Sequence, residues 1–298
     1  MATMADRTVS TIAPAKINLY LHVVGERSDG YHFLDSLVAF AGIQDLVSAA
    51  PAKNLCLAID GPFSAGLPEA NDNLVLRAAR ELTETWDVGK GAAIRLTKRL
   101  PVAAGMGGGS ADAAAALKIL SQLWNLNPAN DALMDLALRL GADVPVCLNG
   151  QAAFVGGIGE EITAAPPLPP AWLVLVNPGV ALSTAEVFSR CNGDFSRQAR
   201  FTDAVATAEE LAAVLQTSGN DLTEAATALE PVIGDVLAAL KASQGVLLAR
   251  MTGSGSTCFG LFADPAAAKQ AATALTQNHS KWWVKAASLV SDTTRPSS

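Results

Sequence analysis

The segment Pro101 to Leu117, PVAAGMGGGSADAAAAL, decides how the rest of the chain is interpreted. It places four glycines in five positions, at 105, 107, 108 and 109. Inside regular structure a glycine costs about 0.5–1 kcal/mol more than an alanine, so these residues shape backbone and do not fill a core. The alanine-rich run that follows, to Trp124, predicts a helix with Ser110 as its capping residue and Asp112 in its first turn.

A glycine loop that leads into a helix start favours an anion. The first N–H groups of a helix lack partners, its N-terminus carries about +0.5 of an elementary charge, and glycine N–H groups can turn inward. We therefore expect a phosphate over Gly105 to Ser110. A tight strand-to-helix turn is the structural alternative, but it needs only one or two glycines. The segment matches neither the G-x-x-x-x-G-K-[ST] loop, because no lysine follows, nor the dinucleotide fingerprint, whose final glycine is missing.

Length and composition favour a chain with a sizeable core that acts on small molecules. Half of its 298 residues are hydrophobic, which suits two ordinary domains or one large one. A net charge of −7 without a dense Lys/Arg run argues against nucleic acid and anionic membranes as partners. The four cysteines and three histidines show no metal-ligand spacing, so neither a zinc site nor a disulfide scaffold is expected.

Two features favour a cytoplasmic location. The opening MATMADRTVS carries charges where a secretory peptide would be apolar. The uncharged run from Ile162 to Ala185 contains five prolines and is no membrane span. The tail SDTTRPSS is expected to fray.

The first half of the chain reads as alternating strands and helices. Ile12 to Val24 alternates and predicts a strand, with Lys16 and Asn18 on one face, where an ordinary solvated edge is an open alternative. Asn71-Asp72-Asn73 predicts a helix start, and the loosely alternating Ala92 to Leu100 delivers the chain to the glycine loop. Pro128 to Leu140 predicts a helix with Gly141 as its C-terminal cap, followed by Asp143, for which a turn-capping role is equally open.

The second half begins after AAPPLPPAW, Ala164 to Trp172, which predicts a stiff linker. Beyond it we expect a strand at Trp172 to Val176 and a helix opened by Ser183 and Glu186. Residues 191–219 show no clear pattern. A helix is expected over 230–243. After it we expect a strand over 246–251, a glycine turn at 252–257 and a second strand over 258–262, which suit a plain hairpin as well as a second loop of a site.

Three blocks together resemble a family of small-molecule kinases, those named for galactose, homoserine, mevalonate and phosphomevalonate. The blocks are APAKINLYLHVVGERSDGYHFL, PVAAGMGGGSADAAAAL and MTGSGSTCFGLF, in the family's order and spacing over nearly the whole chain. The chain departs from the family at Ala103 and Ala104, where glycine is frequent, and at Met106, where leucine is common. Because alanine resists positive φ, the start of the loop is expected to differ in shape.

The resemblance implies an α+β chain of two domains. The first, 1–168, would be a ribosomal-protein-like nucleotide-binding domain, and the second, 169–298, a ferredoxin-like sandwich. It implies ATP with Mg²⁺, the phosphates over the glycine loop and the adenine near Asn73 and Lys98. The ATP-binding residues that it implies are Asn73, Lys98, Pro101, Ala104, Gly105, Met106, Gly107, Gly108, Gly109 and Ser110.

The acceptor implied by the resemblance is a cytidine diphosphate sugar alcohol. Lys16 and Asp143 would lie at the accepting hydroxyl, and Tyr31 with His32 on the cytidine ring. The substrate-binding residues that it implies are Asn18, Tyr31, His32, Asp143 and Thr184. The third block, with Ser254 and Ser256, is given no specific contact, and the oligomeric state stays open.

Phosphoryl transfer needs positioned groups more than covalent chemistry. Asp143 is the natural acceptor of the hydroxyl proton, and Lys16 beside it would keep the carboxylate ionised. Ser110 is a candidate metal ligand, whereas Asp112 is expected only to stabilise the helix start. Two other functions are weighed: a kinase for another small alcohol, which Tyr31 and His32 argue against, and a non-catalytic nucleotide-binding regulator, which the presence of Lys16 and Asp143 argues against.

Overall fold

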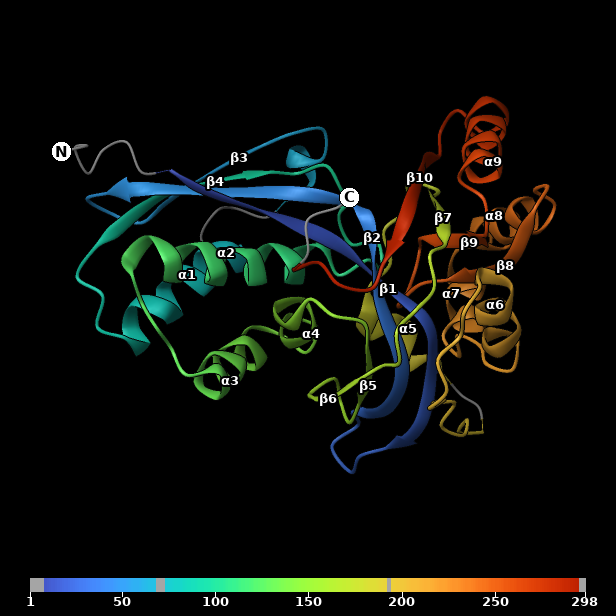
Figure 1. Cartoon of the computed structure of the whole chain (residues 1–298), viewed down its shortest axis with the longest axis horizontal. Helices are drawn as coiled ribbons and strands as arrows, with labels where there is room; N and C mark the ends of the chain where they lie inside the picture. The colour runs from blue at the N-terminus through green and yellow to red at the C-terminus, as the bar shows by residue number, and fades with distance from the viewer. Residues whose placement is uncertain (1–7, 68–72, 192–193, 295–298) are drawn as a thin grey trace. The chain divides into compact units, whose positions relative to one another are not determined.

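The computed structural model describes residues 8–67, 73–191 and 194–294 (Figure 1). The opening residues 1–7, Asn71 and Asp72 of the expected helix start, and the last four residues of the tail lie outside them. Contacts divide the chain into two units, each discontinuous in sequence. The strands β1 (Val9–Glu26) and β2 (His32–Ala52) contribute to both units.

The first unit consists of Ile43–Val102 and Gly108–Asn149 with the described residues up to Ala15. Its sheet holds β4 (Gly91–Thr97) between the second half of β2, which is antiparallel, and β3 (Cys56–Asp60), which is parallel. Figure 1 shows helices α1 and α2 side by side against this sheet. The helices of this unit are η2 (Ser64–Gly66), α1 (Leu74–Thr85), α2 (Gly108–Trp124), α3 (Asn130–Leu140) and α4 (Val144–Asn149).

Helix α2 is the core of the first unit. Every residue from Ala111 to Leu117 is buried, and Leu120, Leu123 and Trp124 continue the buried surface. Alanine has the highest helix propensity and a side chain small enough to let neighbours approach on every side of a helix. The alanine run therefore explains why this helix lies inside the unit.

The second unit consists of Lys16–Gly42, Ala103–Gly107 and the described residues from Gly150 onward. Its main sheet has the antiparallel order β10-β7-β9-β8. Those strands are β7 (Trp172–Asn177), β8 (Val246–Met251), β9 (Cys258–Phe262) and β10 (Trp283–Val290). The helices are α5 (Thr184–Ser189), α6 (Ala208–Gln216), α7 (Thr223–Leu229), α8 (Val232–Lys241) and α9 (Pro265–Asn278).

The chain order of these elements is that of a ferredoxin-like sandwich. Helices α5 to α8 come between β7 and β8, and α9 comes between β9 and β10, which gives β-α-β-β-α-β with the strands in the spatial order 4-1-3-2. Their apolar faces form one core that includes Val174, Leu240 and Phe262. The expected α+β fold and the sandwich are confirmed. Two short strands, β5 (Ala153–Gly156) and β6 (Glu161–Ala164), extend β2 of this unit at Ser36 to Val38.

Most expected elements are confirmed, and four points need comment. The solvated-edge reading of the first strand is wrong, because Ala15 to Val23 are all buried. Residues 191–219, which gave no pattern, contain α6, capped by Thr207 at the N–H of Glu210. Residues 165–171 run without regular structure from β6 to β7, as the linker prediction requires. The contact units do not test the predicted boundary at 168/169, which stays a prediction.

No helix within residues 8–67, 73–191 or 194–294 has the length and apolar character needed to cross a bilayer.

Candidate active site

The glycine loop and the start of α2 differ from expectation in register. Helix α2 begins at Gly108, so Ser110 is its third residue and Asp112 its fifth. The predictions that Ser110 caps this helix and that Asp112 lies in its first turn are therefore wrong. Gly107, at φ 59°, is the last residue before the helix, three residues before the expected cap.

At the start of the loop, Ala103 adopts the positive φ that alanine was expected to resist. Ala103 adopts φ 51°, although left-handed backbone is strained for any residue with a Cβ. A residue held in such a region costs about 1–3 kcal/mol and persists only where its surroundings impose it. Gly105 (φ 73°) and Gly107 (φ 59°) follow, so three residues in five positions have positive φ.

The glycines of the loop meet three different spatial demands. A Cβ on Gly105 would lie 2.5 Å from the carbonyl oxygen of Thr252 and 2.6 Å from that of Gly255. A Cβ on Gly108 would lie 3.1 Å from Nζ of Lys98. Gly109 is exposed, and a Cβ there would meet only Cδ1 of Leu74 at 3.5 Å. Packing therefore requires glycine at 105, favours it at 108 and does not explain it at 109.

In the second unit, Lys16 and Asn18 on β1 are buried and joined to each other. The Lys16 ammonium donates to Oδ1 of Asn18 at 2.8 Å, and the Lys16 N–H donates to the carbonyl of Met106 at 2.9 Å. Nδ2 of Asn18 donates to Oγ of Ser36 at 2.8 Å. The strand thus holds a cation and an amide directly beside the backbone of the glycine loop.

The turn at 252–257 is more than a plain hairpin. Oγ1 of Thr252 accepts the backbone N–H of Asn18 at 2.8 Å, and the Thr257 N–H donates to the carbonyl of Ala104. Asn220 supports the turn by donating to the carbonyls of Met251 and Gly253, each at 2.8 Å. No contact was predicted for this block, although its alternating glycines and hydroxyl residues indicate a turn that can bond neighbouring backbone.

Thr184, Tyr31 and His32 also belong to the second unit. Thr184 follows the capping residue Ser183 at the start of α5, and its hydroxyl lies 2.9 Å from that of Ser254. Tyr31 is 62% exposed, and the Arg27 guanidinium lies over its ring at 5.9 Å from the centroid. The His32 ring lies 5.3 Å from that of Phe188. Tyr31 therefore has an exposed aromatic ring, which stacking on a base would need.

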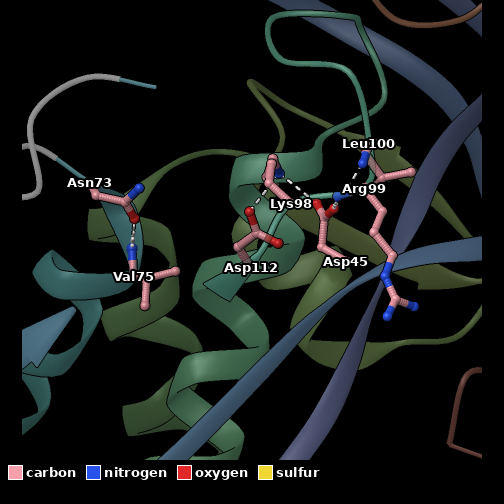
Figure 2. A network of polar contacts seen from close by, with 7 residues as sticks. All are labelled: Asp45, Asn73, Val75, Lys98, Arg99, Leu100 and Asp112. Atoms are coloured by element: carbon pink, nitrogen blue, oxygen red, sulfur yellow. Dashed lines mark hydrogen bonds and ion pairs between the residues drawn. The ribbon is translucent and has the colours of Figure 1, made fainter. Parts of the chain in front are cut away.

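The first unit contains a buried charge network (Figure 2). Nζ of Lys98 donates to Asp45 at 2.5 Å and to Asp112 at 2.6 Å, and each of the three side chains is at most 3% exposed. Burial alone would lower the pKa of Lys98, but Asp112 and Asp45 outweigh it and raise that pKa. For Asp112, burial and the neighbouring Asp45 outweigh the attraction of Lys98 and raise its pKa to about 7. Two carboxylates that share one ammonium cannot both be fully compensated.

The other predicted residues of the first unit occupy the ends of helices. Asn73 is the N-cap of α1, and its Oδ1 accepts the Val75 N–H at 2.9 Å (Figure 2). Asp143 directly precedes α4, and its carbonyl accepts the Cys147 N–H at 3.3 Å. Pro101 is buried and Ser110 partly so. The structure thus brings Lys16, Asn18 and Met106 together in one unit and Lys98 with its carboxylates in the other, and the common site that joins these groups stays a prediction.

Comparison with known proteins identifies the class. The family model described as "GHMP kinases N terminal domain" matches residues 73–151, and the one described as "GHMP kinases C terminal" matches residues 202–281. The chain belongs to the GHMP kinases, which confirms the resemblance seen in its sequence. Its fold is also that of a homoserine kinase from Cytophaga hutchinsonii, 19% identical, with a TM-score of 0.71 over 96% of each chain.

Within this family, the relatives compared next share one name and match nearly the whole chain. The 4-diphosphocytidyl-2-C-methyl-D-erythritol kinase of Paramagnetospirillum magneticum is 55% identical over 279 residues, 94% of this chain and 98% of the relative. The kinase of the same name from Rhodospirillum rubrum is 51% identical over 291 residues, which are 98% of this chain and 96% of the relative. A crystal structure of a 4-(cytidine 5'-diphospho)-2C-methyl-D-erythritol kinase, 34% identical, covers 95% of this chain and 99% of its own with a TM-score of 0.77.

Gly105→Ala and Gly109→Ala form a matched pair that tests the roles of the glycines. We expect Gly105→Ala to lower the free energy of unfolding by at least about 2 kcal/mol, because it adds both positive-φ strain and a backbone clash. We expect Gly109→Ala to stay within about 0.5 kcal/mol of wild type or to be more stable, because alanine suits a helix better. Urea unfolding measures both, and equal losses would contradict this assignment.

Asp112→Asn tests the buried carboxyl through pH. With a pKa raised from 3.8 to about 7, the folded chain keeps a proton that the unfolded chain releases, so the contribution of Asp112 to stability falls as the pH rises between these values and is constant above them. The wild type should therefore lose stability relative to Asp112→Asn from pH 4.5 to 7, by at most about 1.4 kcal/mol per pH unit. Parallel curves of unfolding free energy against pH would contradict the raised pKa.

Proposed function

We propose that the chain transfers the terminal phosphoryl group of ATP to the 2-hydroxyl of 4-diphosphocytidyl-2-C-methyl-D-erythritol, giving the 2-phosphate and ADP. This is a step of the non-mevalonate route to isoprenoid precursors. The observation that carries the proposal is the identity of 55% and 51% with kinases of that name over nearly the whole of both chains.

The nucleotide site is proposed along the glycine loop and the start of α2. The first N–H groups of this helix have no carbonyl partner within it and face an anion favourably. Gly109 supports the proposal, because it is exposed and packing leaves room for a side chain that the sequence does not supply. A phosphate approaching the backbone would need that space. Asn73 and Lys98 are proposed near the adenine, with Pro101, Ala104 and Met106 completing the loop.

Mg²⁺ is proposed to arrive with the nucleotide. Among the described residues no group of three or more His, Cys, Asp or Glu side chains could hold a metal ion. Mg²⁺ does not need such a group, because proteins commonly bind it through phosphate oxygens, water and one or two side chains. Ser110, in the first turn of α2, is the proposed side-chain ligand, and the ion would neutralise charge on the phosphates.

The acceptor is proposed to meet Lys16 and Asp143. Asp143 would take the hydroxyl proton, and the Lys16 ammonium, which Asn18 already orients at 2.8 Å, would balance negative charge during transfer. Asn18 and Thr184 would bind the substrate, and the exposed Tyr31 with His32 would bind the cytosine by stacking and hydrogen bonding.

Two further lines remain proposals beside the reaction. The division into a nucleotide-binding domain, 1–168, and a second domain, 169–298, is supported by the family matches, which fall at 73–151 and 202–281, one within each part. The cytoplasmic location and the absence of nucleic-acid partners stay predictions from composition and charge.

Substrate choice tests the proposal most directly. In an ADP-release assay with ATP, we expect 4-diphosphocytidyl-2-C-methyl-D-erythritol to be used with a kcat/KM at least about 10³ times that of homoserine, mevalonate or galactose, because a site built to hydrogen-bond a base rejects analogues without one. Preference for homoserine or mevalonate would move the chain to another activity of the family. Binding of ATP with no turnover of any acceptor would instead support a nucleotide-binding regulator.

Asp143→Asn tests the proposed base. We expect kcat to fall by about 10²–10⁴ with little change in KM, because a positioned base contributes about that factor. Asp131→Asn is the matched control, since Asp131 is an exposed acid in the first turn of the preceding helix. Steady-state kinetics at saturating ATP measure both. A kcat for Asp143→Asn within threefold of wild type would rule out the base role.

A further inference from the structure

We propose that Asp45 is a positioning residue of the glycine loop. It fixes the segment that leads into the loop and, through Lys98, the helix that follows the loop. The inference rests on the proposed function, because it concerns how that loop comes to bind ATP. Asp45 lies in the second half of β2, outside the three blocks that carry the family resemblance.

One end of the loop is held by the first oxygen of the Asp45 carboxylate. Oδ1 accepts the N–H of Leu100 at 2.8 Å and also the N–H of Arg99. These two residues follow β4 and directly precede Pro101, where the loop starts (Figure 2). One carboxylate oxygen therefore sets the direction in which the chain leaves the sheet.

The other end is held through Lys98. The second oxygen of Asp45, Oδ2, accepts from Nζ of Lys98 at 2.5 Å, and the same ammonium donates to Oδ2 of Asp112 at 2.6 Å. Asp112 lies on α2, one turn beyond the point where the loop ends. A Cβ on Gly108 would lie 3.1 Å from this ammonium, so a side chain there would press on the contact. The bridge thus ties the start of α2 to the segment that follows β4.

The energetic cost of this network argues for a role beyond stability. Its three side chains are at most 3% exposed, and buried ion pairs are commonly no more stabilising than apolar residues of the same volume. Oδ1 of Asp112 is buried without a hydrogen-bond partner among the described residues, so the arrangement is not optimised for stability. What ionic contacts do provide is direction, and the loop needs it because three of its residues, including Ala103, have positive φ.

Asp45→Asn tests the proposal, with Asp35→Asn as the matched control. Asp35 is also fully buried and binds a backbone N–H, that of Ala199 at 2.8 Å, and a cation, Arg200 at 2.6 Å. It also accepts from the Tyr20 hydroxyl at 2.8 Å, and none of these three partners is a loop residue or directly adjoins the loop. Both variants lose one buried charge. The measurements, at pH 8, are ATP dissociation by calorimetry with a non-hydrolysable ATP analogue, KM for ATP and for the alcohol, kcat, and urea unfolding.

We expect Asp45→Asn to weaken analogue binding and to raise KM for ATP about tenfold or more, while KM for the alcohol stays within twofold, because a loop misplaced by about 1 Å loses much of its binding geometry. Asp35→Asn should lower stability and leave KM for ATP unchanged. Equal effects of the two variants on ATP, or a change in stability alone for Asp45→Asn, would overturn the proposal.

Two provisions keep the outcome decisive. If Asp45→Asn does not fold, Asp112→Asn removes charge at the α2 end only and should raise KM for ATP about fivefold, and an unchanged KM would overturn the proposal. The wild type is titrated first. If it binds no analogue, the proposed function fails, whereas normal binding by the wild type and by Asp45→Asn alike refutes only the positioning role.

Discussion

The second unit depends on one close approach of backbone to backbone. Gly105 of the glycine loop faces the carbonyls of Thr252 and Gly255, and Gly253 faces the carbonyl of Gly105, each so closely that a Cβ on either glycine would lie about 2.5 Å from an oxygen. Hydrogen bonds connect this contact to β1. Thr252 accepts the N–H of Asn18, and Asn18 accepts the Lys16 ammonium. Segments far apart in the sequence are thus fixed relative to one another by the absence of two side chains.

Much of the fold could be predicted from the sequence, because capping residues and glycines mark where many helices and strands begin or end. The cap at Ser183 and the C-terminal Gly141 lie where the sequence placed them, and the strand over 246–251 has the expected limits. Helix α9 was not predicted although Asp264 caps it and Pro265 opens it, a readable signal that was not used. Helix α7, whose cap position is Leu222 without a side-chain bond, gives no such signal.

What could not be predicted depends on partners distant in the chain. Lys16 alternates with apolar residues as an edge residue would, but it is buried, and its strand bonds residues far along the chain: Met106 through Lys16, and Ser36 and Thr252 through Asn18. Asp112 was expected to stabilise a helix start, but its real partner is Lys98, the residue that directly follows β4. The residue types of the site were therefore readable from the sequence, whereas their burial and pairing were not.

The glycine at 109 bears on how inhibitors of this protein would fare. An alanine at 109 fits the surrounding chain and would repel a compound that fills the space above this residue, but its Cβ would also occupy the space that the proposed phosphate site needs. A compound that leaned on Gly105 would be harder to escape, since a side chain at that position collides with main-chain oxygens and not with a movable group. A substitution that confers resistance would therefore cost nucleotide binding at 109 and stability at 105.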